Sequence, residues 1–81
     1  MKNISEKVKE IIAEYLGERR ENVCDDSNIL DDLAADSLEV IELAMAFEEE
    51  FSIEINNEEM EKLVTVADVV RCIEEKVAAK K

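Results

Sequence analysis

Several residue types that shape small proteins are scarce or absent in this chain. Its 81 residues include no Pro, no His, no Trp and a single Gly. Tight β-hairpins depend on Gly, Asn-Gly or Pro, so the scarcity disfavours an all-β fold. Without His, the chain can build neither a Ser-His or Cys-His nucleophile pair nor a His-ligated metal site. The composition indicates a helical protein with no catalytic residues and no metal site.

Cysteines and long apolar runs are also few. Cys24 and Cys72 are 48 positions apart and belong to no paired-Cys spacing, which excludes a zinc framework and disfavours a disulfide scaffold. The first residues lack the apolar run of a signal peptide, and no stretch approaches membrane-spanning length. We therefore expect a single domain over residues 1–81, located in the cytoplasm.

Basic residues are missing from the middle of the chain. The net charge is −12, and residues 21–61 contain 15 acidic residues but no Lys or Arg. The remaining 40 residues hold ten bases against seven acids. Such a field repels nucleic-acid phosphates and anionic membrane surfaces, and it attracts proteins with basic patches. A solvated acidic surface normally mixes both signs, so this pattern favours a face selected for basic partners.

The apolar pattern predicts an all-α protein, a small four-helix bundle. Apolar residues recur at helical spacing over residues 4–16, and further helices are expected over 37–51, as a short turn near 57–62, and from about 65 onward. Helix starts and ends carry the expected capping residues, which are Asn3, Gly17, Asp36 with Glu39, and Thr65 with Asp68. The result is three main helices and one short one, with a long loop over residues 17–35.

The helix expected over residues 37–51 has two apolar stripes on opposite sides. One is the predicted core face, made of Val40, Leu43, Ala44, Phe47 and Phe51. The other, which we call the outer stripe, consists of Leu38, Ile41 and Met45, flanked by Glu42, Glu48 and Glu49. Both stripes could be buried if the helix were central. In so small a bundle that is hard to achieve, so we expect the outer stripe to be a docking surface.

Ser37 stands at the start of this helix, directly after Asp36. One interpretation is a capping serine, which is common at helix starts. The other is a modification site, since the free N–H groups and the dipole of a helix N-terminus stabilise an attached phosphodiester. Ser37 has no His to activate it, and no Lys or Arg within residues 21–61, so any chemistry there needs another enzyme.

The segment LAADSLEVIELAMAFEEEF, over residues 33–51, resembles the modification site and second helix of the acyl carrier proteins. The resemblance extends over nearly the whole chain. It includes the first helix ending at Gly17, the segment around residues 54–63, and the Thr65-Val66 start of the last helix.

The resemblance implies a four-helix bundle in which Ser37, between Asp36 and Leu38, carries a 4′-phosphopantetheine arm installed by a phosphopantetheinyl transferase. The thiol of the arm would hold acyl groups as thioesters for fatty-acid synthesis enzymes with basic docking patches, and the carrier would act as a monomer. The family's partner contacts match Leu38, Glu39, Ile41, Glu42, Met45, Glu48 and Glu49. Positions near its acyl cavity match Leu43, Phe47, Ile55, Leu63 and Ile73.

Two positions depart from the family pattern. Ala34 stands where the family usually has Gly, so the loop there is expected to be altered. Asn56 stands where Pro is common, and its loss is expected to loosen the start of the short helix. Two alternatives stay open beside the fatty-acid carrier: a dedicated carrier for polyketide, lipid-modification or aminoacyl chemistry, and an unmodified acidic protein-interaction module.

Overall fold

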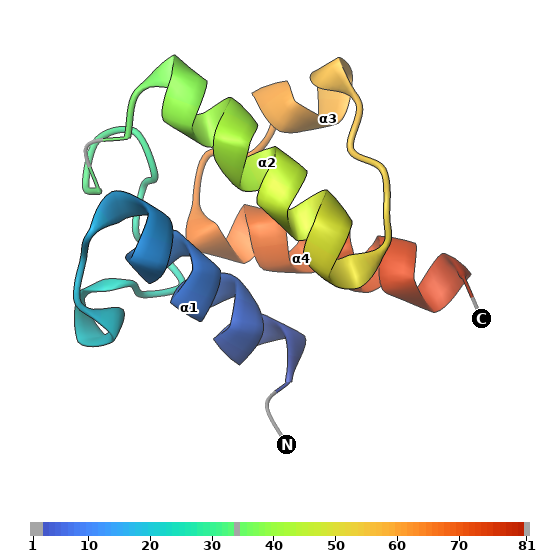
Figure 1. The fold of residues 1–81 in the computed structure, drawn as a ribbon, viewed down its shortest axis with the longest axis horizontal. Helices are drawn as coiled ribbons and strands as arrows, with labels where there is room; N and C mark the ends of the chain where they lie inside the picture. Colours follow the sequence, from blue (N-terminus) through green and yellow to red (C-terminus); the bar gives the residue numbers. More distant parts are fainter. Residues whose placement is uncertain (1–2, 34, 81) are drawn as a thin grey trace.

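The computed structural model describes residues 3–33 and 35–80, and Figure 1 shows the fold. Its helices are α1 (Ile4–Leu16), α2 (Ser37–Phe51), α3 (Asn57–Glu61) and α4 (Val66–Ala79), with a single 3₁₀ turn, η1 (Arg20–Asn22). The described residues form no strand beyond one isolated bridge between Asn28 and Thr65. The predicted all-α bundle of three main helices and one short helix is confirmed. The 3₁₀ turn was not predicted.

The helices surround one apolar core. α1 lies beside α2, α4 passes behind them, and α3 lies next to α2 at the top of the view in Figure 1. α1 packs against both α2 and α4, while α3 packs against α2. The largest fully buried side chains come from α1, α2, α4 and the loop, and they are Val8, Ile12, Val23, Ile29, Leu43, Phe47, Val66, Val69 and Ile73. No helix among the described residues is long and apolar enough to cross a membrane.

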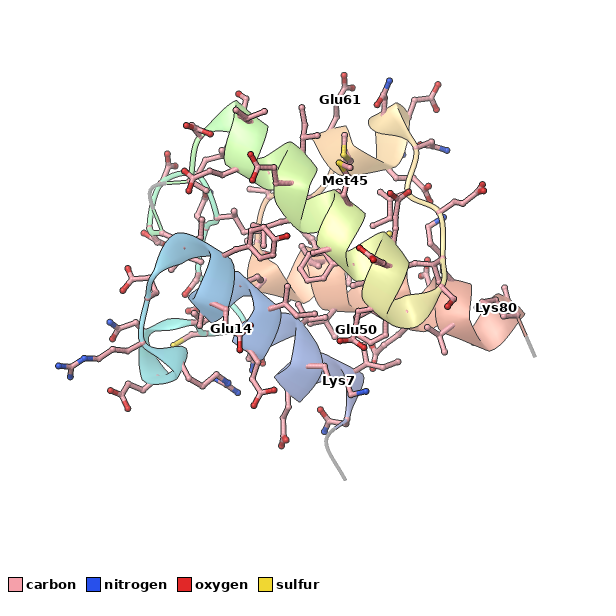
Figure 2. All side chains as sticks on the ribbon, in the orientation of Figure 1. Lys7, Glu14, Met45, Glu50, Glu61 and Lys80 are labelled. Carbon is pink, nitrogen blue, oxygen red and sulfur yellow. The ribbon has the colours of Figure 1, made fainter. Side chains whose placement is uncertain are left out.

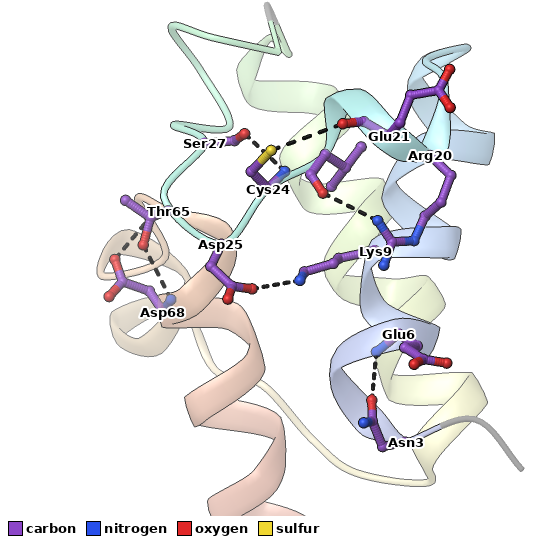
Figure 3. A network of polar contacts seen from close by, with 11 residues as sticks. Asn3, Glu6, Lys9, Arg20, Glu21, Cys24, Asp25, Ser27, Thr65 and Asp68 are labelled. Atoms are coloured by element: carbon purple, nitrogen blue, oxygen red, sulfur yellow. Dashed lines mark hydrogen bonds and ion pairs between the residues drawn. The ribbon is translucent and has the colours of Figure 1, made fainter.

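The expected caps form. The Asn3 side chain accepts a hydrogen bond from the Glu6 backbone N–H at 2.9 Å (Figure 3). Gly17 ends α1 with φ +66°, the left-handed conformation that a residue without Cβ adopts most readily. Thr65 and Asp68 form a reciprocal capping box at the start of α4. The helix limits are therefore fixed by local hydrogen bonds as well as by burial.

The long loop between α1 and α2 is fastened to the core by its apolar side chains. We call residues 17–33 the anchored loop, because Val23, Ile29 and Leu33 are buried in the core. Its backbone also pairs with the chain around the start of α4: Ile29 N–H donates to the Val64 carbonyl, and Ala67 N–H to the Asp25 carbonyl. The loop follows the core closely, although it contains little regular structure.

An ion pair adds a third kind of contact to the anchored loop. Lys9 on α1 lies 2.6 Å from the Asp25 carboxylate, and most of the lysine side chain is covered (Figure 3). Nearby, the Arg20 guanidinium donates to the Val23 carbonyl, which holds η1 against the chain that follows it. The ion pair thus joins α1 to the anchored loop, and the backbone hydrogen bonds of the loop join the loop to the start of α4.

The start of α3 is capped by Asn56, which stands where the family commonly has Pro. Its side chain accepts from the Glu59 backbone N–H at 2.8 Å, and its own backbone N–H donates to the Glu59 carboxylate at 3.1 Å. A Pro has no N–H to donate, so this reciprocal capping box requires another residue at the position. Asn56 thus supplies a hydrogen bond that a Pro would lack, and the expected loosening of this start stays a prediction. Ala34, the other departure, lies outside the described residues.

Candidate functional site

The start of α2 is capped by Asp36, not by Ser37. The Asp36 carboxylate accepts from the Glu39 backbone N–H at 2.8 Å, and the Asp36 backbone N–H donates to the Glu39 carboxylate at 3.1 Å. Ser37 is the first helical residue and is exposed. Its hydroxyl forms no hydrogen bond with any other residue that the structure describes. The capping interpretation of Ser37 is therefore wrong, and its oxygen is accessible to another molecule.

A groove of about 460 Å³ opens beside Ser37, and we call it the α2–α3 groove. Its walls come from α2, α3, the connection between α3 and α4, and the anchored loop. The residues that line it are mostly apolar, and they are Leu30, Ser37, Val40, Ile41, Asn57, Met60, Glu61, Leu63 and Val64. A chain attached to Ser37 would thus start at the edge of a mainly apolar channel.

The outer stripe is exposed, as the helical pattern predicted. Leu38, Ile41 and Met45 are 63%, 43% and 61% exposed. Figure 2 shows Met45 projecting outward from α2. Leu30 and Val64, which line the groove, are about half exposed as well. Five of the six large exposed apolar side chains among the described residues thus belong to the outer stripe or line the groove beside Ser37.

Sequence reasoning did not assign Leu30, Met60 and Val64 to the site. Leu30 and Val64 lie in irregular segments, where no periodic pattern shows which residues face outward. Met60 is on α3, whose five residues are too few for a periodic signal. Their place at the groove follows from how the anchored loop and α3 pack against α2.

The four glutamates assigned to partner contact differ in their surroundings. Glu42 and Glu49 are exposed, and neither forms an ion pair with another residue that the structure describes. The Glu39 carboxylate completes the capping box. The Glu48 carboxylate accepts a hydrogen bond of 2.7 Å from the backbone N–H of Ile55, so it holds the chain that follows α2. Only two of the four carboxylates therefore have no structural contact to lose when a partner binds.

The comparisons with known proteins agree with this geometry. A family model described as the phosphopantetheine attachment site matches residues 6–73. A curated acyl carrier protein of Zymomonas mobilis subsp. mobilis is 48% identical over 75 residues, which cover 93% of this chain and 96% of that protein. The chain belongs to the acyl carrier protein family. A solved acyl carrier protein of Enterococcus faecalis shares 38% identity with a TM-score of 0.78, covering 90% of this chain and 92% of that one.

Membership of this family settles the broad class of activity. Acyl carrier proteins are non-catalytic carriers whose cofactor is 4′-phosphopantetheine, and they interact with fatty-acid synthesis enzymes. The residues present fit that cofactor, because an exposed serine, whose hydroxyl bonds to no other described residue, stands at a helix N-terminus and at the edge of a mainly apolar groove.

The residues that match the family's acyl cavity are all part of the core. Leu43, Phe47, Ile55, Leu63 and Ile73 are buried together in one cluster. Of the five, Leu63 also lines the α2–α3 groove. Leu63 therefore joins the groove to the interior of the bundle. The role of the five as an acyl cavity stays a prediction.

One ion pair ties α3 to α4 near this groove. Lys76 Nζ lies 2.8 Å from a Glu59 carboxylate oxygen. This hydrogen bond, with a smaller contribution from the Asn56 backbone, lowers the pKa of Glu59 below its ordinary value and raises that of Lys76. Burial is the largest cause of the raised pKa of the Cys72 thiol close by, so that thiol is a poor nucleophile.

Proposed function

We propose that Ser37 is the attachment site of 4′-phosphopantetheine and that the chain carries acyl groups for fatty-acid synthesis. The observation that carries the proposal is the division of roles at the start of α2. Asp36 supplies the cap, and the exposed Ser37 hydroxyl is left without a structural role. When bound, the arm supplies a terminal thiol that holds acyl groups as thioesters.

The residues around Ser37 favour a negatively charged ester at this position. Ser37 is the first residue of a 15-residue helix, so the positive end of the helix dipole lies at its side chain. Asp36 engages the N–H of Glu39, which leaves the N–H groups of Ser37 and Leu38 without partners among the described residues. The helix start thereby offers both a field and donors to a phosphodiester.

Partner enzymes would dock on α2 through two kinds of contact. The outer stripe supplies apolar area, and the exposed carboxylates of Glu42 and Glu49 supply attraction to a basic patch. We propose that the phosphopantetheinyl transferase and the fatty-acid synthesis enzymes both use this surface. Glu39 and Glu48 stand on the same helix, but their hydrogen bonds make their contribution mainly structural.

The finer features of the role follow the sequence. We propose a single carrier domain over residues 1–81 that acts as a monomer in the cytoplasm, where the free thiols of Cys24 and Cys72 stay reduced. A dedicated carrier for polyketide, lipid-modification or aminoacyl chemistry would share every feature of the site. The acyl species bound to protein isolated from its host distinguishes these pathways.

The attachment site is tested by intact mass. The chain is incubated with coenzyme A and a phosphopantetheinyl transferase, together with Ser37→Ala and the matched control Ser52→Gly, which removes an exposed serine at the other end of α2. Wild type and control should gain one cofactor, and Ser37→Ala none. Modified Ser37→Ala would place the arm elsewhere. A wild type left unmodified would favour the acidic interaction module.

The docking surface is tested by the kinetics of transferase binding. Glu42→Lys should slow association, and the defect should shrink as salt screens the charge. Met45→Ala should speed dissociation with little salt dependence, since it removes apolar area worth about 1–2 kcal/mol on burial. Glu74→Lys, an equal charge change at an exposed position on α4, is the control. If Glu42→Lys and Glu74→Lys slow association equally, the transferase responds to the overall negative charge of the chain and not to a defined surface.

A further inference from the structure

A second groove lies between α1 and α2, and the proposed function assigns no role to it. It holds two adjoining hollows of about 370 and 260 Å³ that share Ile11, Glu14 and Glu50. The first hollow also contains Tyr15 and Ala46. Ser37 lines neither hollow. This α1–α2 groove is therefore separate from the groove beside Ser37.

Apolar side chains form part of the floor of the α1–α2 groove, although it lies at the surface. Ile11 and Ala46 are half-buried, and Tyr15 is 51% exposed, which makes it the one large exposed apolar side chain remote from Ser37 among the described residues. An exposed ring beside aliphatic side chains is costly to leave in water and is a common anchor for a protein partner.

The rim of the groove is acidic. Glu14 comes from α1, and Glu49 and Glu50 come from the last turn of α2. Figure 2 shows Glu14 and Glu50 on the same face of the molecule, with Lys7 close to Glu50. None of the three carboxylates forms an ion pair with another described residue. Carboxylates from two helices thus converge on the groove, and Lys7, which lines only the second hollow, is the one basic side chain among its described lining.

This combination selects one kind of occupant. A long cationic side chain can lay its methylene groups on Ile11 and Ala46 while its charged head reaches the carboxylates. The Tyr15 ring favours arginine over lysine, because the planar guanidinium stacks on aromatic faces and pairs with carboxylates in a fork. Lys7, at the far end of the second hollow, would repel a cation, so the arginine should lie at the Tyr15 end.

We propose that the α1–α2 groove is a second docking site, which takes an arginine-bearing segment of a partner protein. Glu49 stands both on this rim and on the acidic edge of the outer stripe, so the two docking surfaces are continuous. A large partner could cover both, and a partner on the second site alone would leave Ser37 uncovered. The proposal does not depend on modification of Ser37.

The groove is tested by NMR titration of the ¹⁵N-labelled full chain in its unmodified form. The probe is a helical alanine-based peptide with arginines on one face, compared with the same peptide carrying lysines. Shifts should concentrate at the amides of Ile11, Tyr15, Ala46 and Glu50, and arginine should bind more tightly than lysine. Shifts spread evenly over the acidic surface, or confined to the outer stripe, would overturn the proposal.

Variants separate this site from general attraction to a chain of net charge −12. Glu14→Gln with Glu50→Gln should weaken arginine-peptide binding about fivefold, the sum of two exposed charge pairs. The control pair Glu58→Gln with Glu74→Gln makes the same charge change on α3 and α4 and should weaken it much less. Tyr15→Leu keeps the apolar floor and should remove the preference for arginine. Equal weakening by both pairs, or an unchanged preference in Tyr15→Leu, would refute the site.

Discussion

The anchored loop and helix α3 are fastened to the bundle in different ways. The loop buries Val23, Ile29 and Leu33 and pairs its backbone with the chain around the start of α4. No residue of α3 is buried, although Ile53 and Ile55 in the connection before it belong to the core. α3 itself is held by its capping box, by the Glu59–Lys76 ion pair and by the partly buried side chain of Met60. Regular secondary structure is therefore a poor guide to which part of this protein is firmly held.

The difference suits the place of each segment. α3 forms one wall of the α2–α3 groove, and the anchored loop forms another. A wall held by exposed polar contacts opens at a lower free energy than a wall held by buried apolar side chains. A groove with one firm wall and one lightly held wall can accept chains of different width without unfolding the core.

The sharpest test of this contrast compares one apolar side chain from each segment. Ile29→Ala should lower the free energy of unfolding by about 2–5 kcal/mol, because it leaves a cavity in the core. Met60→Ala on α3 should cost about 1 kcal/mol, since that side chain is only partly buried. Urea unfolding of both variants measures the difference. Equal losses would mean that α3 is part of the core.

The next test concerns the hydrogen bond between the Glu48 carboxylate and the connection from α2 to α3. Glu48→Ala removes the acceptor for the Ile55 N–H and should cost about 1–2 kcal/mol, because a partly buried donor is left unpaired. Glu42→Ala on the same helix removes an exposed carboxylate that forms no hydrogen bond or ion pair with the described residues, and it should change stability by less than about 0.5 kcal/mol. Thermal and urea unfolding can be compared for the pair. A neutral Glu48→Ala would return Glu48 to the set of purely partner-facing carboxylates.

A smaller gain is expected at the residue that ends α2. Ser52 has φ +55°, the left-handed conformation that side chains with Cβ adopt at a cost. Ser52→Gly should therefore raise the free energy of unfolding by about 0.5–1 kcal/mol. Ser52→Ala retains the Cβ and should show no such gain. If both variants behave alike, the conformation of this residue stores no strain.

The smallest expected effect is the pH dependence of the stability contributed by the ion pair between α3 and α4. The hydrogen bond from Lys76 lowers the folded-state pKa of Glu59 below 4.5, its ordinary value. The pair therefore stabilises the fold above about pH 4.5 and loses this contribution as the pH falls through the lower, folded-state pKa. The stability difference between wild type and Glu59→Gln should shrink over that range. In a Lys76→Gln background, the stability difference caused by Glu59→Gln should change less with pH. An unchanged pH dependence would contradict the assignment of the Glu59 pKa shift to Lys76.

The sequence predicted what local patterns determine. Asp36 and Glu39 lie three positions apart, so their capping box is visible in the chain itself, and the exposure of the outer stripe follows from helical geometry. The contacts that depend on chain reversal were not predictable. Glu48 meets the N–H of Ile55 only because the chain turns after α2. In the same way, no pattern in residues 20–22 distinguishes the 3₁₀ turn from an open loop.

The site was predictable to a similar degree. The outer stripe was predicted from its helical spacing, and Ser37 was assigned as the modification site from the resemblance of residues 33–51 to the acyl carrier proteins, an assignment that stays a prediction. The lining of the α2–α3 groove was not predicted, since Leu30, Met60 and Val64 come from three separate segments. Side chains brought together from distant segments leave no spacing in the sequence, and their meeting depends on how the whole core packs.

The capping box of Asp36 has a consequence for the working cycle of the protein. Since the helix start is completed by the neighbouring carboxylate, a group esterified to Ser37 would leave every backbone hydrogen bond of α2 unchanged. The enzyme that adds a group and the enzyme that removes it would then meet the same rigid platform. Adding or removing the group would then change only what Ser37 carries, and no folding step would slow the turnover of the carrier.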